Sequence, residues 1–477
     1  MNAQILLGID VGTSGVKVVA STLDGRMLRD AVARYPTAVG AGDSGAEQDA
    51  NAWWSALVDI CGRVVAGSDV ASVAVTSQAP TLVPIDADGR TVGPALTWLD
   101  RRAVEQGESI ARVAPGHRHG GDPFFGTAKL AWLLDERPDI AERTTQVLSA
   151  NGFIAFRLSG AAALDDSSAS LMQGFDESTS RFDDRLFGSG LGVELLPEVV
   201  PTTEIIGRVT ADAAAVTGIP AGTPVAAGAI DSVGSALEAG ALDVGDPLVE
   251  MSGFSSVTIL AVPHGTRVPG FIHSRHCVPG VDLLITAQVT AGATVDWLNR
   301  TAGGDQDLRE IGPLLERPRP SRLTFVPALA GERTPSWNQR TRGLIDGIDL
   351  ASDGVDLMLA AMEGNALALA TDIRILRDHG FDVQSMLSTG GGSTSDAWMQ
   401  IKADVLQLEA ARPRAGHGAA HGAAFLGGLS TGILSVDDIR GFGGEIESKF
   451  VPDPTVAEPY TRKLEHFGAL LTVARDR

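Results

Sequence analysis

Short apolar runs and stretches of helical periodicity follow one another along the first part of the chain. Residues 5–9 and 16–21 are apolar runs that predict buried strands, and the glycine-containing residues 12–15 between them predict a tight turn. Apolar side chains then recur at helical spacing over residues 49–66, and another buried strand is predicted at residues 70–76. This order predicts an α/β protein. Its opening pair of strands differs from a Rossmann unit, in which a helix follows the first strand directly.

The second half of the sequence resembles this opening. Strands are predicted at residues 248–251 and 257–262, and the small residues at 252–256 predict a turn between them. Because a similar strand–turn–strand pattern occurs at residues 5–21, we infer two related halves that meet near residues 240–247. A cleft between two packed domains is a common place for a ligand, so we expect the functional site there.

Several of the remaining segments are predicted to be helical. Apolar periodicity predicts helices at residues 127–134 and 141–158 in the first half, and at residues 357–379 and 398–408 in the second. The last two helices flank a glycine-rich loop at residues 388–396, which is a candidate for contact with a ligand.

The composition limits the classes of function. Of 477 residues, 38 are Lys or Arg and 59 are Asp or Glu, which gives a formal net charge of -21. This balance argues against binding to nucleic acid or to an anionic membrane, both of which select basic patches. Cys61 and Cys277 predict neither a disulfide framework nor a zinc site, and no run of about 20 apolar residues predicts a membrane span. We therefore expect a cytoplasmic enzyme that binds neither nucleic acid nor membrane.

The turn at residues 12–15 is the first candidate for ligand chemistry. Gly12, Thr13 and Ser14 offer small side chains, hydroxyl groups and exposed amides, so a phosphate can approach the backbone closely. Asp10, at the end of the preceding strand, could hold a Mg²⁺ ion that bridges phosphates. The alternative is an ordinary hairpin turn beside a capping aspartate. A P-loop is excluded, because no lysine in the chain follows a glycine.

Two further segments carry candidate chemistry. Asp231 follows an apolar strand and opens a small-residue helix, where the helix N-terminus keeps a carboxylate ionised and able to accept a proton. A simpler role is equally open there, because aspartate is a favoured helix N-cap. The glycines at residues 390–392 would let a flat group such as adenosine lie against the backbone, although a flexible turn has the same composition.

These three sites together resemble those of the FGGY family of carbohydrate kinases, within the actin/Hsp70/hexokinase-like ATPase superfamily. The resemblance covers nearly the whole chain. Residues 8–17 (GIDVGTSGVK) are similar to the family's first phosphate motif, and residues 343–363 fit its second signature at every defined position. Residues 124–136 (FFGTAKLAWLLDE) resemble the first signature except at Gly126, where Pro, Ser or Thr is usual. Segments similar to the xylulokinase branch in particular are residues 98–102, 165–170, 276–280 and 331–335.

The resemblance implies two ribonuclease-H-like domains with an interdomain cleft, at residues 1–243 for sugar and phosphate and at residues 244–477 for nucleotide. It also implies ATP and Mg²⁺ as cofactors and a small sugar or polyol as substrate. Asp231 matches the family's catalytic base and Asp10 its acid near Mg²⁺, so both are expected beside the metal, through water. The residues expected at ATP or its phosphates are Asp10, Gly12, Thr13, Ser14, Lys17, Gly253, Ser255, Gly390, Gly391, Gly392 and Ser393. Those expected at the sugar are Gln78, Ala79, Trp98, Asp100, Arg102, Asp231 and Ser232.

This resemblance leads to a hypothesis for the reaction. Asp231 would deprotonate the terminal hydroxyl of the sugar, which attacks the γ-phosphorus in line, and positioning and charge neutralisation would supply most of the catalysis. Gln78, Asp100 and Arg102 are expected to recognise sugar hydroxyls, and Trp98 to form an apolar wall.

Three departures from the xylulokinase pattern bear on the substrate. Residues 78–81 read Gln-Ala-Pro-Thr in place of Gln-Met-His-Gly, Ser232 replaces an Asn, and Phe254 replaces a Thr in the second phosphate turn. We therefore expect a reshaped sugar pocket. D-xylulose is the default substrate, with another ketose, a polyol or a sugar acid (ribulose, erythritol, gluconate) as alternatives. A non-catalytic sugar or nucleotide sensor is the alternative from another class, and a homodimer, common in such kinases, stays open.

Overall fold

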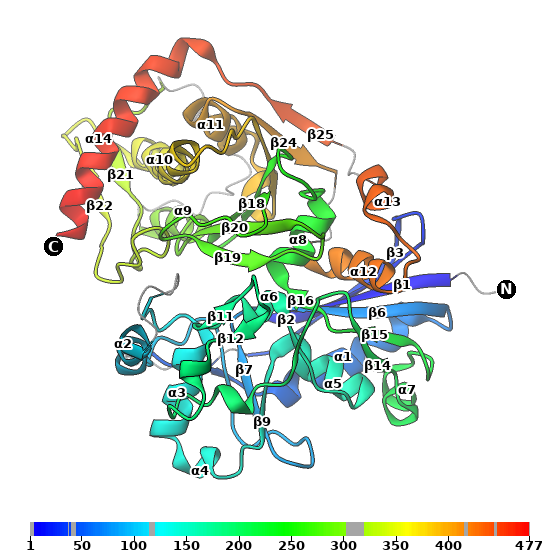
Figure 1. Cartoon of the computed structure of the whole chain (residues 1–477). Coiled ribbons are helices and arrows are strands. Elements are labelled where there is room, and N and C mark those ends of the chain that lie inside the picture. Colours follow the sequence, from blue (N-terminus) through cyan, green and yellow to red (C-terminus); the bar gives the residue numbers. More distant parts are fainter. Residues whose placement is uncertain are drawn as a thin grey trace.

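The computed structural model describes residues 4–36, 38–39, 44–113, 120–301, 319–414, 418–442 and 446–476. Two seven-stranded sheets form the centres of two halves, and in Figure 1 the N-terminal half lies below the C-terminal half. No helix in the described part of the chain is long and apolar enough to cross a lipid bilayer.

The first sheet has the order β14-β15-β6-β1-β2-β3, with β16 beside β6. Strand β1 pairs antiparallel with β2 and parallel with β6, which confirms the predicted opening hairpin and the strand after the first helix. The strands of this sheet are β1 (Gln4–Val11), β2 (Gly15–Ser21), β3 (Met27–Arg34), β6 (Asp69–Ser77), β14 (Ile205–Arg208), β15 (Pro224–Ala226) and β16 (Ala229–Ile230).

The second sheet repeats this plan in the order β19-β20-β18-β17-β23-β24-β25. Strand β17 pairs antiparallel with β18 and parallel with β23, as β1 does with β2 and β6. Its strands are β17 (Leu248–Ser252), β18 (Ser256–Pro263), β19 (Ile272–Arg275), β20 (Val281–Gln288), β23 (Ser385–Thr389), β24 (Glu409–Pro413) and β25 (Ile446–Phe450). The repeated topology confirms the inference of two related halves with ribonuclease-H-like sheets.

Helices cover both sheets, and the first of them follows its sequence signals closely. Helix α1 (Ala50–Val65) begins after Asp49, whose side chain accepts a hydrogen bond from the Asn51 N–H, and it packs against β2 and β3. The other helices are α2 (Val104–Val113), α3 (Gly126–Glu136), α4 (Pro138–Ala141), α5 (Ala150–Ser159), α6 (Asp166–Ala169), α7 (Ala211–Thr217), α8 (Asp231–Ala239), α9 (Gly292–Thr301), α10 (Gly354–Asp378), α11 (Asp396–Leu406), α12 (Ala419–Ser430), α13 (Val436–Gly441) and α14 (Ala457–Arg475).

Small sheets complete the two halves. They contain β4 (Ala38–Val39), β5 (Ala46–Gln48), β7 (Leu82–Ile85), β8 (Ala95–Leu96), β9 (Gln146–Ser149), β10 (Leu164–Asp165), β11 (Phe175–Asp176), β12 (Arg181–Phe182), β13 (Val199–Val200), β21 (Thr324–Val326) and β22 (Leu344–Asp346). The single helix predicted at residues 141–158 is wrong, because β9 pairs with β7 there and only α5 is helical. Val147 and Leu148, which fitted the helical spacing, are instead fully buried in this strand.

The two halves share a hydrophobic core, and strand alternation decides which residues enter it. In β1, Ile5 and Leu7 pack in the core beneath α1 and α5, whereas Leu6 points to the opposite face and joins the shared core. In β18, Leu260 packs in the core that contains α10, whereas Ile259 joins the shared core. Each sheet therefore buries one face within its own half and the other against the partner half.

Helix α12 comes from the second half of the sequence but packs against β1, β6 and α8 of the first (Figure 1). A Cβ atom at Gly8 would lie 1.9 Å from the carbonyl oxygen of Ala420, so only glycine allows this strand and helix to approach. A Cβ atom at Gly422 would likewise lie 1.8 Å from the carbonyl oxygen of Gly234 on α8. This close crossing fixes α8, which begins at Asp231, between the two sheets.

Candidate active site

A cavity of about 310 Å³ lies where the two halves meet. It is lined from both sides, and many of the residues predicted from the sequence face it. From the first half these are Thr13, Ala79, Trp98, Asp231 and Ser232, and from the second half Gly253, Ser255 and Gly390. The structure therefore brings the three predicted segments to one cavity, although they are far apart in the sequence.

The turn between β1 and β2 is held in place by side chains around it. Tyr35 donates its hydroxyl proton to the carbonyl oxygen of Gly12 at 2.5 Å, and the Gln48 amide donates to the carbonyl oxygen of Thr13 at 2.7 Å. The indole N–H of Trp98 donates to the hydroxyl oxygen of Thr13 at 3.0 Å. These bonds fix the turn before any ligand arrives, which is the preorganisation that a phosphate site needs.

The remaining predicted residues of the first turn lie at its edge. Ser14 is exposed, and its carbonyl oxygen accepts a hydrogen bond from the Tyr35 N–H at 3.3 Å. Lys17 lies on β2 directly opposite Asp10, and its ammonium nitrogen is 3.8 Å from a carboxylate oxygen of Asp30. The positive charge of Lys17 lowers the pKa of Asp10, against the stronger effect of burial.

Two carboxyl groups with raised pKa values belong to the site. Burial raises the pKa of Asp10 to about 7, with a further contribution from the negative charge of Asp231, while Thr76 donates a hydrogen bond at 3.0 Å. Burial raises the pKa of Asp231 to about 6, and hydrogen bonds from Ser232 oppose this rise. Asp231 is the first residue of α8, and Ile230 occupies the N-cap position, so the N-cap alternative for Asp231 is wrong.

The second turn, between β17 and β18, is built from backbone contacts. The Gly253 N–H donates to the carbonyl oxygen of Ser255 at 2.9 Å, and the carbonyl oxygen of Phe254 accepts from the N–H groups of Ala291 and Ala293 at 2.9 and 3.1 Å. The Phe254 side chain is 74% exposed. The start of α9 thus supports this turn, and the residue that stands in place of Thr extends into solvent.

A buried charged network lies beneath the second turn. The ammonium nitrogen of Lys402 is 2.7 Å from a carboxylate oxygen of Glu250 and 3.1 Å from the hydroxyl oxygen of Ser252. Ser388 and Ser256 donate hydroxyl hydrogen bonds to the two oxygens of Glu250, at 2.6 and 3.1 Å. The network joins β17, β18, β23 and α11, so it ties the second turn to the predicted nucleotide loop.

That loop depends on its glycines. Gly390 has a φ of +84° and Gly391–Thr394 forms one turn of 3-10 helix, closed by the Ser393 hydroxyl, which donates to the carbonyl oxygen of Gly390 at 2.7 Å. A Cβ atom at Gly392 would lie 2.1 Å from the hydroxyl oxygen of Ser252, and one at Gly390 would lie 2.6 Å from its carbonyl oxygen. The flexible-turn alternative does not fit this packing, because the loop lies directly against the second phosphate turn.

Three of the residues predicted to recognise the sugar have polar partners elsewhere. Gln78 is buried and donates its amide hydrogen to Gln48 at 2.6 Å. Asp100 and Arg102 form an ion pair at 2.6 Å, and Arg102 also pairs with Glu47 at 2.7 Å. None of the three is among the residues that line the described cavity, so their contact with sugar remains a prediction.

Arg333 is the main site residue without a predicted role. It lines the cavity beside Phe124 and Met251, and its guanidinium carbon lies 4.5 Å from the centre of the Phe124 ring and 5.1 Å from that of Trp98. Its sequence signal was the segment at residues 331–335, which resembled the xylulokinase branch without indicating what the arginine does.

The carboxyl groups of the site fit a magnesium ion. Burial, together with the negative charge of Asp231, raises the pKa of Asp10, and a divalent cation would favour the charged form of Asp10. Within the described ranges, no group of three or more His, Cys, Asp or Glu side chains could hold a metal. The two carboxyl groups themselves fit Mg²⁺, which is often held by one or two carboxylates together with water and substrate phosphates.

Comparisons with known proteins agree with this geometry. Models of the N-terminal and C-terminal domains of the FGGY family of carbohydrate kinases match residues 5–237 and 251–431. A xylulose kinase of Streptomyces rubiginosus is 30% identical over 98% of this chain and 96% of its own, and a gluconokinase of Bacillus subtilis is 26% identical over 91% and 89%. The crystal structure of a xylulose kinase from Rhodospirillum rubrum aligns with a TM-score of 0.89 and 26% identity over 98% of each chain. The chain is therefore a carbohydrate kinase that belongs to the FGGY family, near its xylulokinase branch.

Proposed function

We propose that the protein transfers the γ-phosphate of ATP to a hydroxyl group of a pentulose, with D-xylulose as the first candidate. The observation that carries this proposal is the single cavity at which Asp231, the two small-residue turns and the glycine loop meet. Similarity to xylulose kinases over nearly the whole chain supports a pentulose. Similarity to gluconokinases keeps a sugar acid among the compounds to be tested.

In the proposed mechanism, Asp231 accepts the proton of the attacking hydroxyl. Its burial raises its pKa to about 6, which makes it a better base than an exposed aspartate while it is still mostly ionised at pH 7. Trp98 forms one wall of the cavity and is held by its bond to Thr13, so the sugar would be oriented by a rigid ring.

The phosphates would be bound by the two turns rather than by lysines. Thr13 of the first turn and Gly253 and Ser255 of the second line the cavity, so N–H groups of these turns are proposed to bind phosphate. Gly390, Gly391, Gly392 and Ser393 are proposed to hold adenosine. Asp10 and Asp231 would hold Mg²⁺, which neutralises phosphate charge during the transfer. Closure of the two halves would exclude water and limit hydrolysis of ATP.

A panel assay tests the proposal. ADP release is measured with D-xylulose, D-ribulose, erythritol, glycerol and D-gluconate, each at the same concentration with MgATP. The proposal predicts release that depends on a pentulose and is greatest with D-xylulose. Release with gluconate alone would move the protein to the sugar-acid kinases, and sugar binding without any release would favour the sensor alternative that the replacements at Phe254 and Ala79 motivate.

Two broader expectations remain predictions. A homodimer would be detected by sedimentation of the purified protein. Action in the cytoplasm, where MgATP is supplied, would be tested by fractionating cells that express the protein.

A further inference from the structure

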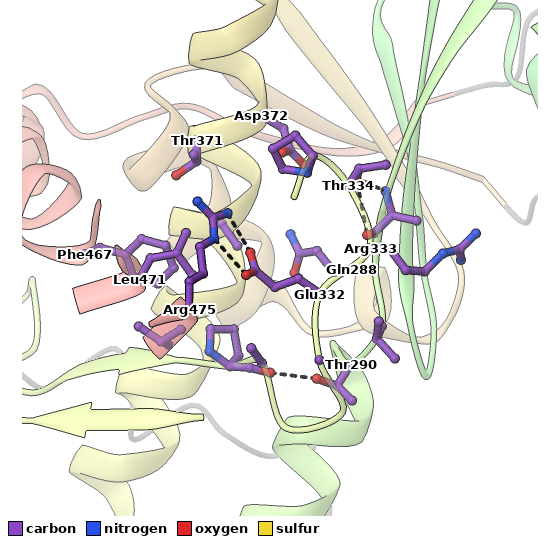
Figure 2. Close-up of a pocket in the computed structure, with 18 residues that line it drawn as sticks. Gln288, Thr290, Glu332, Arg333, Thr334, Thr371, Asp372, Phe467, Leu471 and Arg475 are labelled. Atoms are coloured by element: carbon purple, nitrogen blue, oxygen red, sulfur yellow. Dashed lines mark hydrogen bonds and ion pairs between the residues drawn. The ribbon is translucent and has the colours of Figure 1, made fainter. Parts of the chain in front are cut away.

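The segment at residues 331–335 separates two cavities. On one side lies the cavity between the two halves, and on the other lies an inner cavity of the second half (Figure 2). Asp372, Gln288 and Arg475 are among the residues that line the inner cavity. Ala287 and Arg333 line both cavities, so a shift of this segment would change the lining of both.

Glu332 and Arg333, two successive residues of the segment, point in different directions. Figure 2 shows Glu332 pointing into the inner cavity, where its carboxylate oxygens lie 2.8 Å from two guanidinium nitrogens of Arg475. Thr341 donates a further hydrogen bond to Glu332 at 2.9 Å. Arg333 extends away from these groups in the same view. Glu332 therefore anchors the segment inside the second half, and Arg333 is left to face the cleft.

Among the described residues, no carboxylate forms an ion pair with the Arg333 guanidinium. Within the described residues it makes no hydrogen bond or ion pair of 4.0 Å or less, and its Nε is buried without an acceptor. Burial lowers the pKa of Arg333 to about 10, and the positive charge of Arg101 adds to that effect, whereas the negative charges of Asp122 and Asp231 oppose it. Arg101 itself pairs with Asp122 at 2.9 Å, so the two neighbouring arginines differ in this respect.

The rings of Phe124 and Trp98 compensate only part of this cost. A cation over an aromatic face gains less free energy than an unpaired charge loses when it is withdrawn from water. A group that stabilised the fold would be expected to have a carboxylate or carbonyl partner. The cation is instead kept in a cavity that also contains Asp231, where a substrate rich in oxygen atoms would supply the missing acceptors.

We propose that Arg333 is a substrate-binding residue that donates hydrogen bonds to carbonyl or hydroxyl oxygens of the sugar and holds the reacting hydroxyl beside Asp231. The assignment rests on the proposed function, and it names one contact that would set the specificity of the kinase for its sugar. The sugar would lie against Phe124 and Trp98, with its oxygen-rich edge toward the guanidinium. Asp231 and Arg333 both line the cavity, so one ligand bound there can contact both groups.

The test compares R333M, R333K and the matched control R340M, since Arg340 is an exposed arginine beyond the same segment. Each variant is assayed with the best acceptor of the wild-type enzyme from the panel above. R333M is expected to raise KM for the sugar about 10- to 100-fold, the range for loss of a hydrogen bond to a charged group. KM for ATP should change less than about twofold, R333K should recover part of the loss, and R340M should match the wild type.

A second readout separates binding from a structural role. Because R333M removes a half-buried cation that has no ion-pair partner among the described residues, the melting temperature of the ligand-free protein is expected to stay the same or rise. An unchanged KM for the sugar in R333M, or a lower melting temperature with equal losses for sugar and ATP, would overturn the assignment and leave the kinase function intact. Absence of transfer by the wild type with every acceptor would overturn the proposed function itself, and this assignment with it.

Discussion

The two turns proposed to bind phosphate occupy equivalent places in two sheets of the same topology, yet they are built differently. The turn of the first half follows Asp10 and is fixed by the side chains of Tyr35, Gln48 and Trp98. The turn of the second half follows Met251, is fixed by backbone bonds to the start of α9, and presents Phe254 to solvent. Both halves therefore present a strand–turn–strand backbone, whereas Asp10 and Asp231, the two aspartates of the proposed chemistry, belong to the first half.

The supports beneath the turns differ as well. Under the first turn, Gln48 accepts hydrogen bonds from Trp53 and Gln78, so that support is neutral. Under the second turn the support is the buried pair of Lys402 and Glu250. A net charge of -21 would oppose the binding of MgATP, so we expect both turns to rely on local N–H groups rather than on bulk positive charge.

The largest expected effect is at Asp231, on the side of the cleft that carries the chemistry. D231N removes the proposed base and should lower kcat by about 10³- to 10⁴-fold, at the upper end for loss of general base catalysis. Binding of ATP, measured by calorimetry, should persist. D212N, a change at an exposed aspartate of α7, is the matched control, and D231N activity within tenfold of the wild type would remove Asp231 from the mechanism.

The support of the second turn should be the most sensitive to loss of charge. K402M leaves the buried Glu250 without its cationic partner and should lower the free energy of unfolding by about 3–5 kcal/mol in urea denaturation. K449M breaks the exposed pair of Lys449 and Glu409 and should cost about 0–1 kcal/mol. Equal losses of unfolding free energy in the two variants would show that the buried pair stabilises this half no more than the exposed pair does.

The simplest difference between the two turns is that Asp10 precedes the first, whereas Met251 precedes the second. D10N keeps the shape of the side chain but removes the charge that would hold Mg²⁺, and kcat should fall about 100-fold. The exposed Asp24 lies in the turn after β2, and D24N is expected to behave as the wild type. Full activity of D10N at ordinary Mg²⁺ concentration would contradict an asymmetric site.

The pKa of Asp231 predicts a pH dependence with a definite sign. Burial raises this pKa to about 6, and only the ionised form accepts a proton. As the pH falls through 6, kcat/KM should therefore decrease and approach about tenfold per pH unit. Rates measured between pH 5 and pH 8 test this, and a rate that rises on acidification would assign the base to another group.

The smallest effect is expected at Phe254. F254T restores a hydroxyl to the second turn, and one added hydrogen bond to a phosphate should lower KM for ATP about threefold to tenfold. F187T, the same substitution at a half-exposed phenylalanine in the first half of the sequence, serves as the control. A higher KM for ATP in F254T would mean that the exposed ring itself contacts the nucleotide.

Much of the fold could be predicted from the sequence, because the signals were local. The apolar runs that became β1, β2, β17 and β18 and the periodicity that became α1 and α10 are properties of neighbouring residues. The helix predicted over residues 141–158 failed because a short apolar run fits a strand as well as a helix, and pairing with β7 decided the outcome.

The site residues whose type and local sequence imply a chemical role could be predicted. Those whose role depends on three-dimensional contacts could not. Asp10, Asp231 and the glycine loop carried recognisable patterns, and all three lie near one cavity or line it. The partners of Asp100 and Arg102 depend on how the chain folds back, and so does the isolation of Arg333. No local pattern distinguishes an arginine with a carboxylate partner from one without.

The most direct test of the account is to identify where the γ-phosphate goes. The purified enzyme is mixed with MgATP and D-xylulose, and the reaction is followed by ³¹P NMR. The account predicts a phosphate monoester signal that grows in step with ADP, one for one, and that disappears in D231N. Release of inorganic phosphate in its place, or an unchanged ATP spectrum with every pentulose, polyol and aldonate of the panel, would contradict it.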